Sequence, residues 1–143
     1  MKVLTNNPKV LEQFHSYPAV TVDYRAVSLH ELMVLVRDFV HARHRLLTHP
    51  LSGSVKPNET LYKSIGLTEQ PEDQLCLESL NLIEQSISTV DRFARIRKDI
   101  KEEHHQDLQL VDLTLISSAI DSLAAAKPLP GTPPSGSSRL SST

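Results

Sequence analysis

The chain has 143 residues, 39% of them hydrophobic, and its 15 basic residues nearly balance its 17 acidic ones. The single cysteine excludes a disulfide framework or a paired-cysteine zinc or redox centre, and the dispersed basic residues argue against nucleic acid as a partner. No apolar run reaches the ~18–20 residues of a membrane span and no signal peptide is visible, so we expect a cytoplasmic protein without a membrane partner.

The N-terminal elements alternate between strand and helix patterns. The short apolar segment Lys2–Thr5 predicts a strand. Asn7 followed by Pro8 is typical of a helix start, and the apolar spacing behind it predicts a short helix ending near His15. The β-branched run over residues 19–24 predicts a second strand.

A longer helix and two further strands are predicted next. Ser28 and Glu31 have the spacing of a capping box. The apolar residues behind it recur at steps of three and four and predict an amphipathic helix: Leu29, Leu32, Met33, Val36, Phe39 and Val40. Residues 46–48 predict a third strand, and residues 61–67 predict a fourth.

The C-terminal part of the folded region reads as helical. One apolar stripe predicts a helix to about Lys101, and it places Cys76 on the buried side. A second helix is predicted with Leu108, Val111, Leu115, Ala119 and Leu123 on one face. No glycine or proline separates the two, so one long bent helix stays an alternative.

The last residues differ in composition from the rest. Residues 124–143 hold four of the nine prolines and two of the four glycines, with little that could be buried. Such a segment cannot offset its chain entropy, so we expect residues 127–143 to form a disordered proline- and serine-rich tail. Residues 1–126 then form a single α/β domain.

Alternating strands and helices predict the α/β class. The expected architecture is a small, mostly parallel sheet of about four strands with flanking helices, similar to half of a Rossmann fold. A long C-terminal helix or helix pair completes it. The direction of the fourth strand stays open.

In open parallel sheets, ligands bind at the carboxyl ends of the strands. Residues 5–8 and 49–64 should emerge there, and both are rich in hydroxyl and amide groups, with Lys56 and Lys63 flanking the second segment. Gly53 permits a nest-like turn for an anion, although ordinary turn chemistry is the competing interpretation. The candidate ligand-binding residues are Thr5, Asn6, Asn7, His49, Ser52, Gly53, Ser54, Lys56, Asn58, Thr60, Tyr62, Lys63 and Ser64.

Histidines are the other candidates for chemistry. His49 is the candidate catalytic residue, as a base or a ligand partner, with a purely structural role as the alternative. His41 and His44 share a helix face, but no carboxylate at metal-ligand spacing joins them. We therefore expect no metal and no cofactor, and we expect His104 and His105 to be solvated.

The two polar segments together resemble the GrdX family. These are small proteins named for their occurrence beside glycine, sarcosine and betaine reductase genes in amino-acid-fermenting bacteria. The resemblance is carried by Thr5-Asn6-Asn7-Pro8 and by residues 49–60 with Tyr62-Lys63-Ser64. It covers roughly residues 1–100, so the last helix and the tail are expected to be particular to this chain.

The resemblance implies a bacterial accessory protein of amino-acid reductase metabolism, without a fixed molecular function. The favoured hypothesis is a binding module for a small anionic or zwitterionic ligand, such as a phosphate-bearing metabolite or an amino-acid derivative. The alternatives are an assembly protein whose C-terminal helices pair in a homodimer or bind a reductase subunit, and an enzyme that uses the segment 49–64.

Overall fold

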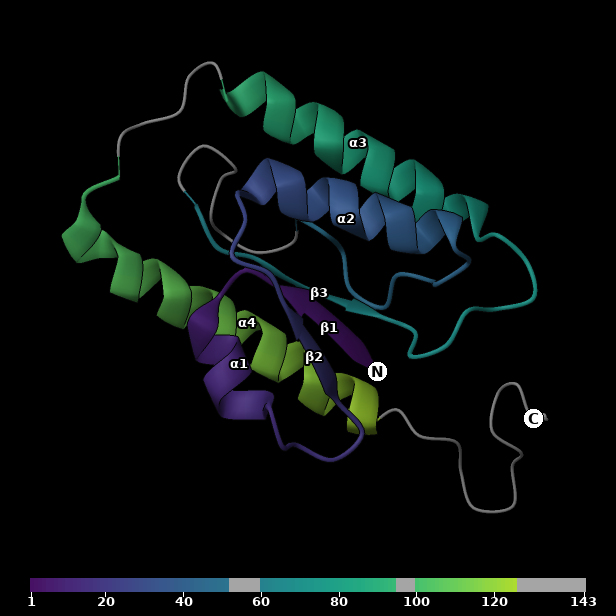
Figure 1. Ribbon diagram of the computed structural model, residues 1–143, viewed down its shortest axis with the longest axis horizontal. Helices are drawn as coiled ribbons and strands as arrows, with labels where there is room; N and C mark the ends of the chain where they lie inside the picture. The colour runs from purple at the N-terminus through teal and green to yellow at the C-terminus, as the bar shows by residue number, and fades with distance from the viewer. Residues whose placement is uncertain (52–59, 95–99, 126–143) are drawn as a thin grey trace.

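A small sheet lies between two layers of helices in the computed structural model, which describes residues 1–51, 60–94 and 100–125 (Figure 1). Helices α2 and α3 cover one face of the sheet, and α1 and α4 cover the other. The elements in chain order are β1 (Lys2–Thr5), α1 (Pro8–Phe14), β2 (Thr21–Tyr24), α2 (Leu29–His41), β3 (Ser64–Leu67), α3 (Leu77–Ala94), the 3₁₀ turn η1 (Glu102–His104) and α4 (His105–Ala125).

The α/β class is confirmed, but the sheet differs from the expected one. It has three strands in the order β2-β1-β3. Strand β1 runs parallel to β2, with Val3 opposite Val22, and antiparallel to β3, with Leu4 opposite Ile65. The prediction of about four mostly parallel strands is therefore wrong, and the sheet is mixed.

Residues 46–48 lie along the free edge of β3 without forming a strand. Leu46 makes a single antiparallel bridge to Leu67, and the Leu47 N–H donates to the Gly66 carbonyl at 2.8 Å. The next ladder bond is replaced, because the Gly66 N–H donates to the Thr48 side-chain hydroxyl at 2.9 Å. Because a side chain takes the place of the backbone partner, the pairing ends here and the predicted strand over residues 46–48 is reduced to a single bridge.

The predicted helix starts of α1 and α2 are confirmed. The Asn7 side chain accepts from the Lys9 N–H at 3.0 Å, with Pro8 in the first turn. At the start of α2, Ser28 Oγ accepts from the Glu31 N–H at 3.1 Å, and the Glu31 carboxylate accepts from the Ser28 N–H at 3.3 Å. These caps satisfy backbone donors that have no partner inside the helix.

The strands divide the core into two parts by alternation of their side chains. Leu4, Ile65 and Leu67 face α2 and α3, where they meet the buried stripe of each helix, including Leu32 and Ile83. On the other face Val3 packs with residues of α1 and α4: Val10, Phe14, Ile116 and Ile120. The motif segments, residues 5–8 and 49–64, adjoin strands β1 and β3 of this sheet, which has a hydrophobic core on each face.

Helix α4 is separate from α3, because Lys101 has an extended backbone and a 3₁₀ turn follows it. Its inward face is not the predicted one: Gln109, Asp112, Ile116 and Ile120 are buried. Val111, Leu115 and Leu123 of the predicted face are 38%, 37% and 37% exposed. The helix thus buries the polar residues Gln109 and Asp112 and turns the apolar stripe outward. The contacts of Asp112 described below explain this orientation.

Residues 102–125 are long and apolar enough to cross a membrane, by length and composition alone. The expectation that no segment reaches that length is therefore wrong. Only 22% of the most apolar window is buried within the described structure. This is weak evidence for a membrane, because a helix of a folded domain passes the same test. The predicted tail, residues 127–143, lies outside the described residues.

Candidate functional site

The two polar motif segments meet at one edge of the sheet. Thr5, the last residue of β1, is paired with Ser64, the first residue of β3. The residues that follow β1 therefore run beside those that precede β3. Residues 46–48 run antiparallel to β3 from Leu67 toward its start, so His49 continues toward the same edge. Residues 5–7 and 60–64 are brought together at this end of the sheet, which we call the polar edge.

Asn6 joins three segments at the polar edge. Its amide nitrogen donates to the Val27 carbonyl at 3.0 Å and to the Leu61 carbonyl at 2.9 Å. Its side-chain oxygen accepts from the Lys63 N–H at 2.9 Å. Both amide N–H groups are used, and Asn6 is only 5% exposed. Its observed contacts are therefore to the chain's own backbone, and they fix the path of residues 61–63.

Asp112 of α4 is the centre of a second buried network. It is 4% exposed and accepts three hydrogen bonds: from the Ser64 N–H at 3.0 Å, from the Ser64 hydroxyl at 2.7 Å and from the Asn7 amide at 3.0 Å. Thr5 Oγ1 lies 2.6 Å from the Ser64 hydroxyl. A carboxylate leaves water at low cost only when donors replace the lost water, and here they do.

Asn7 links this network to helix α1. Its amide nitrogen donates to Asp112 and to the Gln109 carbonyl at 2.8 Å, while its oxygen caps α1. These contacts explain the orientation of α4, because the donors to the Asp112 carboxylate all lie at the polar edge. Sequence reasoning missed both residues, although a lone aspartate within the apolar run of α4 is a usable signal.

Lys63 is a cationic side chain buried at the polar edge, with 8% of its surface exposed. Burial lowers the pKa of the Lys63 ammonium below its ordinary value of 10.5, and attraction to Asp112 opposes that shift. A lysine is seldom buried without a compensating group. The polar edge therefore combines a buried cation and a buried carboxylate with a rigid hydrogen-bonded frame.

Tyr62 and Thr60 complete the described part of the segment before β3. The Tyr62 hydroxyl lies 3.1 Å from His105 Nδ1, with the ring centroids 5.9 Å apart in an edge-to-face arrangement. Thr60 Oγ1 donates to the Tyr62 carbonyl at 3.1 Å, which closes a local turn. The prediction that His105 is solvated is wrong, whereas His104 is exposed as expected.

The remaining predicted residues fall into two groups. His49 is exposed, and its Nδ1 accepts from the Leu51 N–H at 3.1 Å, so its neutral form carries the proton on Nε2. Its catalytic or ligand role stays a prediction. The others lie outside the described residues: Ser52, Gly53, Ser54, Lys56 and Asn58.

The helix histidines have separate surroundings. His44 is buried, its Nδ1 lies 2.8 Å from the Thr68 carbonyl and its ring packs edge-on against Phe39. His41, by contrast, is exposed. Within residues 1–51, 60–94 and 100–125, no three histidine, cysteine or acidic side chains gather as a metal site would require.

Cys76 is not the buried core residue that its spacing predicts. It is half-buried, directly before α3, and its sulfur accepts from the Ser79 hydroxyl at 3.2 Å and from the Ser79 N–H at 3.4 Å. It acts as the cap of α3, so its side chain points along the helix end instead of into the core. These bonds lower the pKa of the Cys76 thiol, because they favour the thiolate, although partial burial opposes the shift.

We expect the pH at which Cys76 is half-reactive toward iodoacetamide to be lower in the folded chain than in the same chain unfolded in urea. The unfolded chain is the control, because it keeps the cysteine and loses the bonds from Ser79. The rate of alkylation measured across pH checks this. Equal midpoints in the two states would show that the Ser79 contacts do not stabilise the thiolate.

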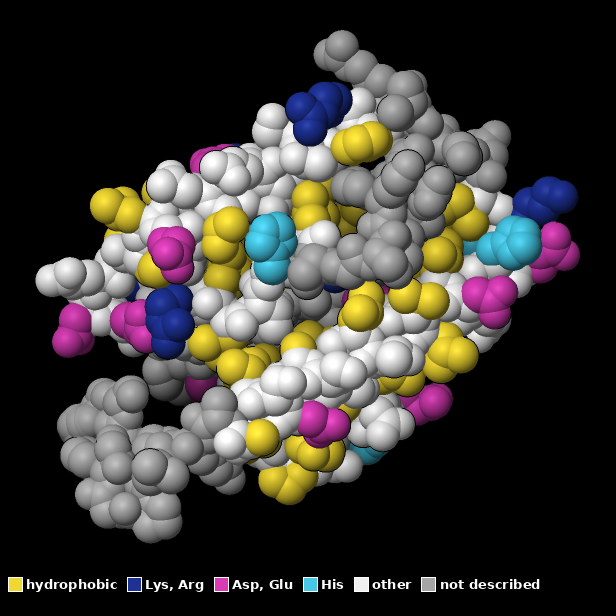
Figure 2. Space-filling view, turned by 180° about the vertical axis from the view of Figure 1, so that it is seen from behind, with side chains coloured by type: hydrophobic (Ala, Val, Ile, Leu, Met, Phe, Trp, Pro, Cys, Tyr) yellow, Lys and Arg dark blue, Asp and Glu magenta, His cyan; other side chains and the backbone are white. Residues whose placement is uncertain are grey.

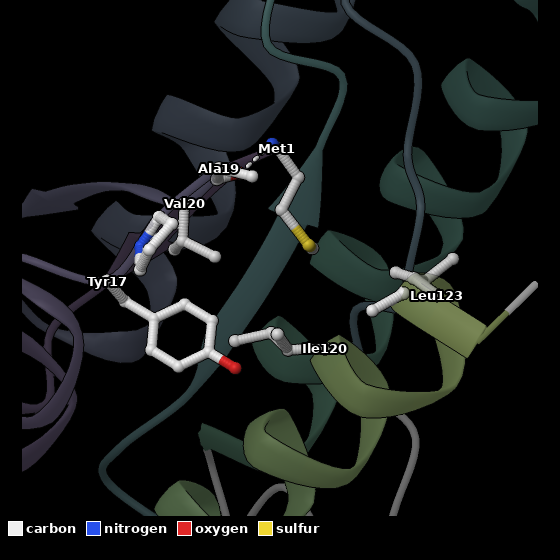
Figure 3. Close-up of a pocket in the computed structure, with 8 residues that line it drawn as sticks. Met1, Tyr17, Ala19, Val20, Ile120 and Leu123 are labelled. Atoms are coloured by element: carbon white, nitrogen blue, oxygen red, sulfur yellow. Dashed lines mark hydrogen bonds between the residues drawn. The ribbon is translucent and has the colours of Figure 1, made fainter. Parts of the chain in front are cut away.

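An apolar pocket lies apart from the polar edge, between the end of α4 and the turn before β2 (Figure 3). Its volume is about 550 Å³. The Met1 ammonium fixes the wall of the pocket by donating to the Ala19 carbonyl at 2.6 Å. Its lining contains no residue predicted for the site: Met1, Tyr17, Pro18, Ala19, Val20, Ile120, Leu123 and Ala124.

The structure thus defines a three-layer α/β protein whose two polar motif segments form one buried, hydrogen-bonded edge. The model of the GrdX-like protein family matches residues 2–121, so the chain belongs to the GrdX-like family. The match includes both motif segments and α4 as far as Asp121, so the expectation that the last helix is particular to this chain is wrong. No curated protein and no solved structure gives a significant match.

Proposed function

We propose that this protein binds a small anion, a phosphate or the carboxylate of an amino-acid derivative, at the polar edge. The observation that carries the proposal is the burial of Lys63 at the point where the two motif segments converge. The bacterial cytoplasmic setting and the accessory role in amino-acid reductase metabolism, which the family resemblance implies, are part of the same proposal.

The electrostatics of the polar edge support an anion as the ligand. Desolvation disfavours the Lys63 ammonium, as the direction of its pKa shift indicates. An anion that enters beside it would favour the charged form. Because the surroundings exclude water, that attraction is stronger than between solvated charges. The Asp112 carboxylate is already occupied by three donors from Ser64 and Asn7, so it holds the frame in place.

Asn6 and Asn7 position the polar edge in this proposal, whereas the sequence suggested that they contact the ligand. The amide donors of Asn6 and Asn7 are engaged within the chain, so these residues position the edge. Lys63 would supply the charge, and Tyr62 with His105 would form the rim. His49, and the candidates within residues 52–59, stay predictions for ligand contacts.

We expect a phosphate or carboxylate compound to raise the melting temperature of the native chain in a thermal-shift screen of inorganic phosphate, nucleotides and amino acids. Lys63→Met should abolish that stabilisation, since it keeps the apolar stem and removes the charge. Lys101→Met is the matched control, because Lys101 is exposed. No stabilisation by any anion, or an equal response in Lys63→Met, would overturn the proposal.

A further inference from the structure

The outward side of α4 carries an apolar surface that the described structure does not cover. Leu110, Val111 and Leu115 are 55%, 38% and 37% exposed. With Asp107 and Thr114 they line a shallow groove of about 380 Å³, which we call the outer face of α4. Hydrophobic side chains follow this helix in the space-filling view (Figure 2). Contiguous exposed apolar surface of this kind marks an interaction site.

The charges of α4 argue against a lipid surface as the partner. Helices that lie on membranes carry lysine and arginine beside their apolar side. Residues 105–125 contain neither, and the exposed charged groups near the outer face are the acids Asp107 and Asp121. An anionic bilayer would repel such a helix, which favours a protein as the partner of the outer face of α4.

We propose that the outer face of α4 pairs with the outer face of α4 in a second copy of this chain, in the antiparallel direction. Val111, Thr114, Ser118 and Asp121 are spaced by three, four and three residues, which keeps them on one side of the helix. With the two-fold axis midway between Val111 and Thr114, Leu110 of one copy lies opposite Leu115 of the other.

The acidic side chains of α4 favour the antiparallel direction. In that arrangement the exposed His104 before the helix lies near Asp121 of the second copy, where a ring N–H can donate to the carboxylate, and the two helix dipoles oppose each other. A parallel pair would instead place Asp107 against Asp107 and Asp121 against Asp121, which is unfavourable. The face is therefore self-complementary in one direction only.

The area of contact sets the strength of the dimer. With the axis midway between Val111 and Thr114, residues 105–120 of the two copies overlap. This stretch is about 24 Å long and roughly 11 Å wide, so the pair covers on the order of 260 Å² per copy. This is below the ~800 Å² per partner of stable complexes, so the dimer is weak and depends on concentration.

Light scattering of the full chain between about 10 µM and about 1 mM, which corresponds to roughly 4–7 kcal/mol of binding free energy, tests the proposal. The apparent mass should rise from 16.0 kDa toward twice that value. Leu110→Asp and Leu115→Asp should each raise the dissociation constant at least ~10-fold by placing a charge in an apolar contact. Leu77→Asp is the matched control, because Leu77 is 66% exposed on α3.

Circular dichroism checks that each variant is folded, which is expected because the leucines are exposed. A monomer at every concentration overturns the proposal, as does a dimer that both α4 variants leave intact. Binding of the wild-type chain to phosphatidylserine vesicles that Leu110→Asp abolishes would also overturn it, in favour of a lipid surface.

Cysteine cross-linking in a Cys76→Ser background tests the direction of the pair. Val111→Cys chains mixed with Thr114→Cys chains should form a disulfide, since these positions face each other. Ser118→Cys chains should not cross-link, because the two copies of residue 118 lie about 16 Å apart along the axis, beyond the reach of a disulfide. Efficient cross-linking through Ser118→Cys would overturn the antiparallel arrangement.

Discussion

Replacing Asp112 by alanine is expected to lower the free energy of unfolding by about 3–5 kcal/mol. The change leaves three buried donors without their acceptor: the Ser64 N–H, the Ser64 hydroxyl and one N–H of Asn7. It also removes the carboxylate that attracts the buried Lys63 ammonium. Urea denaturation of the two chains under the same conditions measures the difference.

Two further variants separate this cause from a general effect of removing a charge from α4. Asp121→Ala lies on the same helix at an exposed position and should change stability by less than about 0.5 kcal/mol. Asp112→Asn keeps one oxygen acceptor and should fall between the two. If Asp112→Ala is as stable as Asp121→Ala, the buried network does not hold α4 to the sheet.

Replacing Asn6 by alanine is expected to cost about 2–4 kcal/mol of unfolding free energy. The variant leaves the carbonyls of Val27 and Leu61 and the N–H of Lys63 without the partner that Asn6 supplies. Since Asn6 is 5% exposed, water cannot easily replace these bonds. Urea denaturation again provides the measurement.

Asn81→Ala is the matched control for Asn6→Ala, because Asn81 is exposed on α3 and helix propensity favours the alanine. Asn6→Asp tests the direction of the hydrogen bonds: it keeps the acceptor for Lys63 but turns an oxygen toward two carbonyls. It should therefore be no more stable than Asn6→Ala. A stable Asn6→Asp variant would mean that the amide donors are not needed.

The parts of the fold that depend on local sequence were predicted well. The cap of α1 at Asn7 and the capping box at Ser28 are interactions between residues two or three apart, so the residue types alone specify them. The sheet depends on pairing between distant segments. Thr5 and Ser64 are 59 residues apart, and nothing local indicates that β3 runs antiparallel to β1.

The face of α4 shows why a correct helix can still be oriented wrongly. The stripe through Val111 and Leu115 has the better apolar periodicity, so sequence reasoning placed it inside. Instead, Asp112 is buried, because it accepts hydrogen bonds from Asn7 and Ser64, which lie 105 and 48 residues before it in the chain. A polar side chain is buried only where other segments supply its hydrogen-bond partners, and a single sequence does not reveal which segments those are.

The motif segments were the most informative part of the sequence for the site. Their polar composition indicated the polar edge, and their convergence follows from the pairing of β1 with β3. The sequence could not predict which residues of these segments hold the structure together and which could contact a ligand. Asn6 and Asn7 look like ligand contacts, yet each hydrogen-bonds backbone groups of the chain itself.

Amide chemical shifts of the native chain, measured while inorganic phosphate or glycine is added, test the proposed anion site most directly. If the polar edge binds an anion, the largest shifts fall on residues 5–7 and 60–64 and are lost in Lys63→Met, while Lys101→Met behaves as the native chain does. If every probe leaves these amides unmoved, or if Lys63→Met responds as the native chain does, the polar edge is a structural joint and not a binding site.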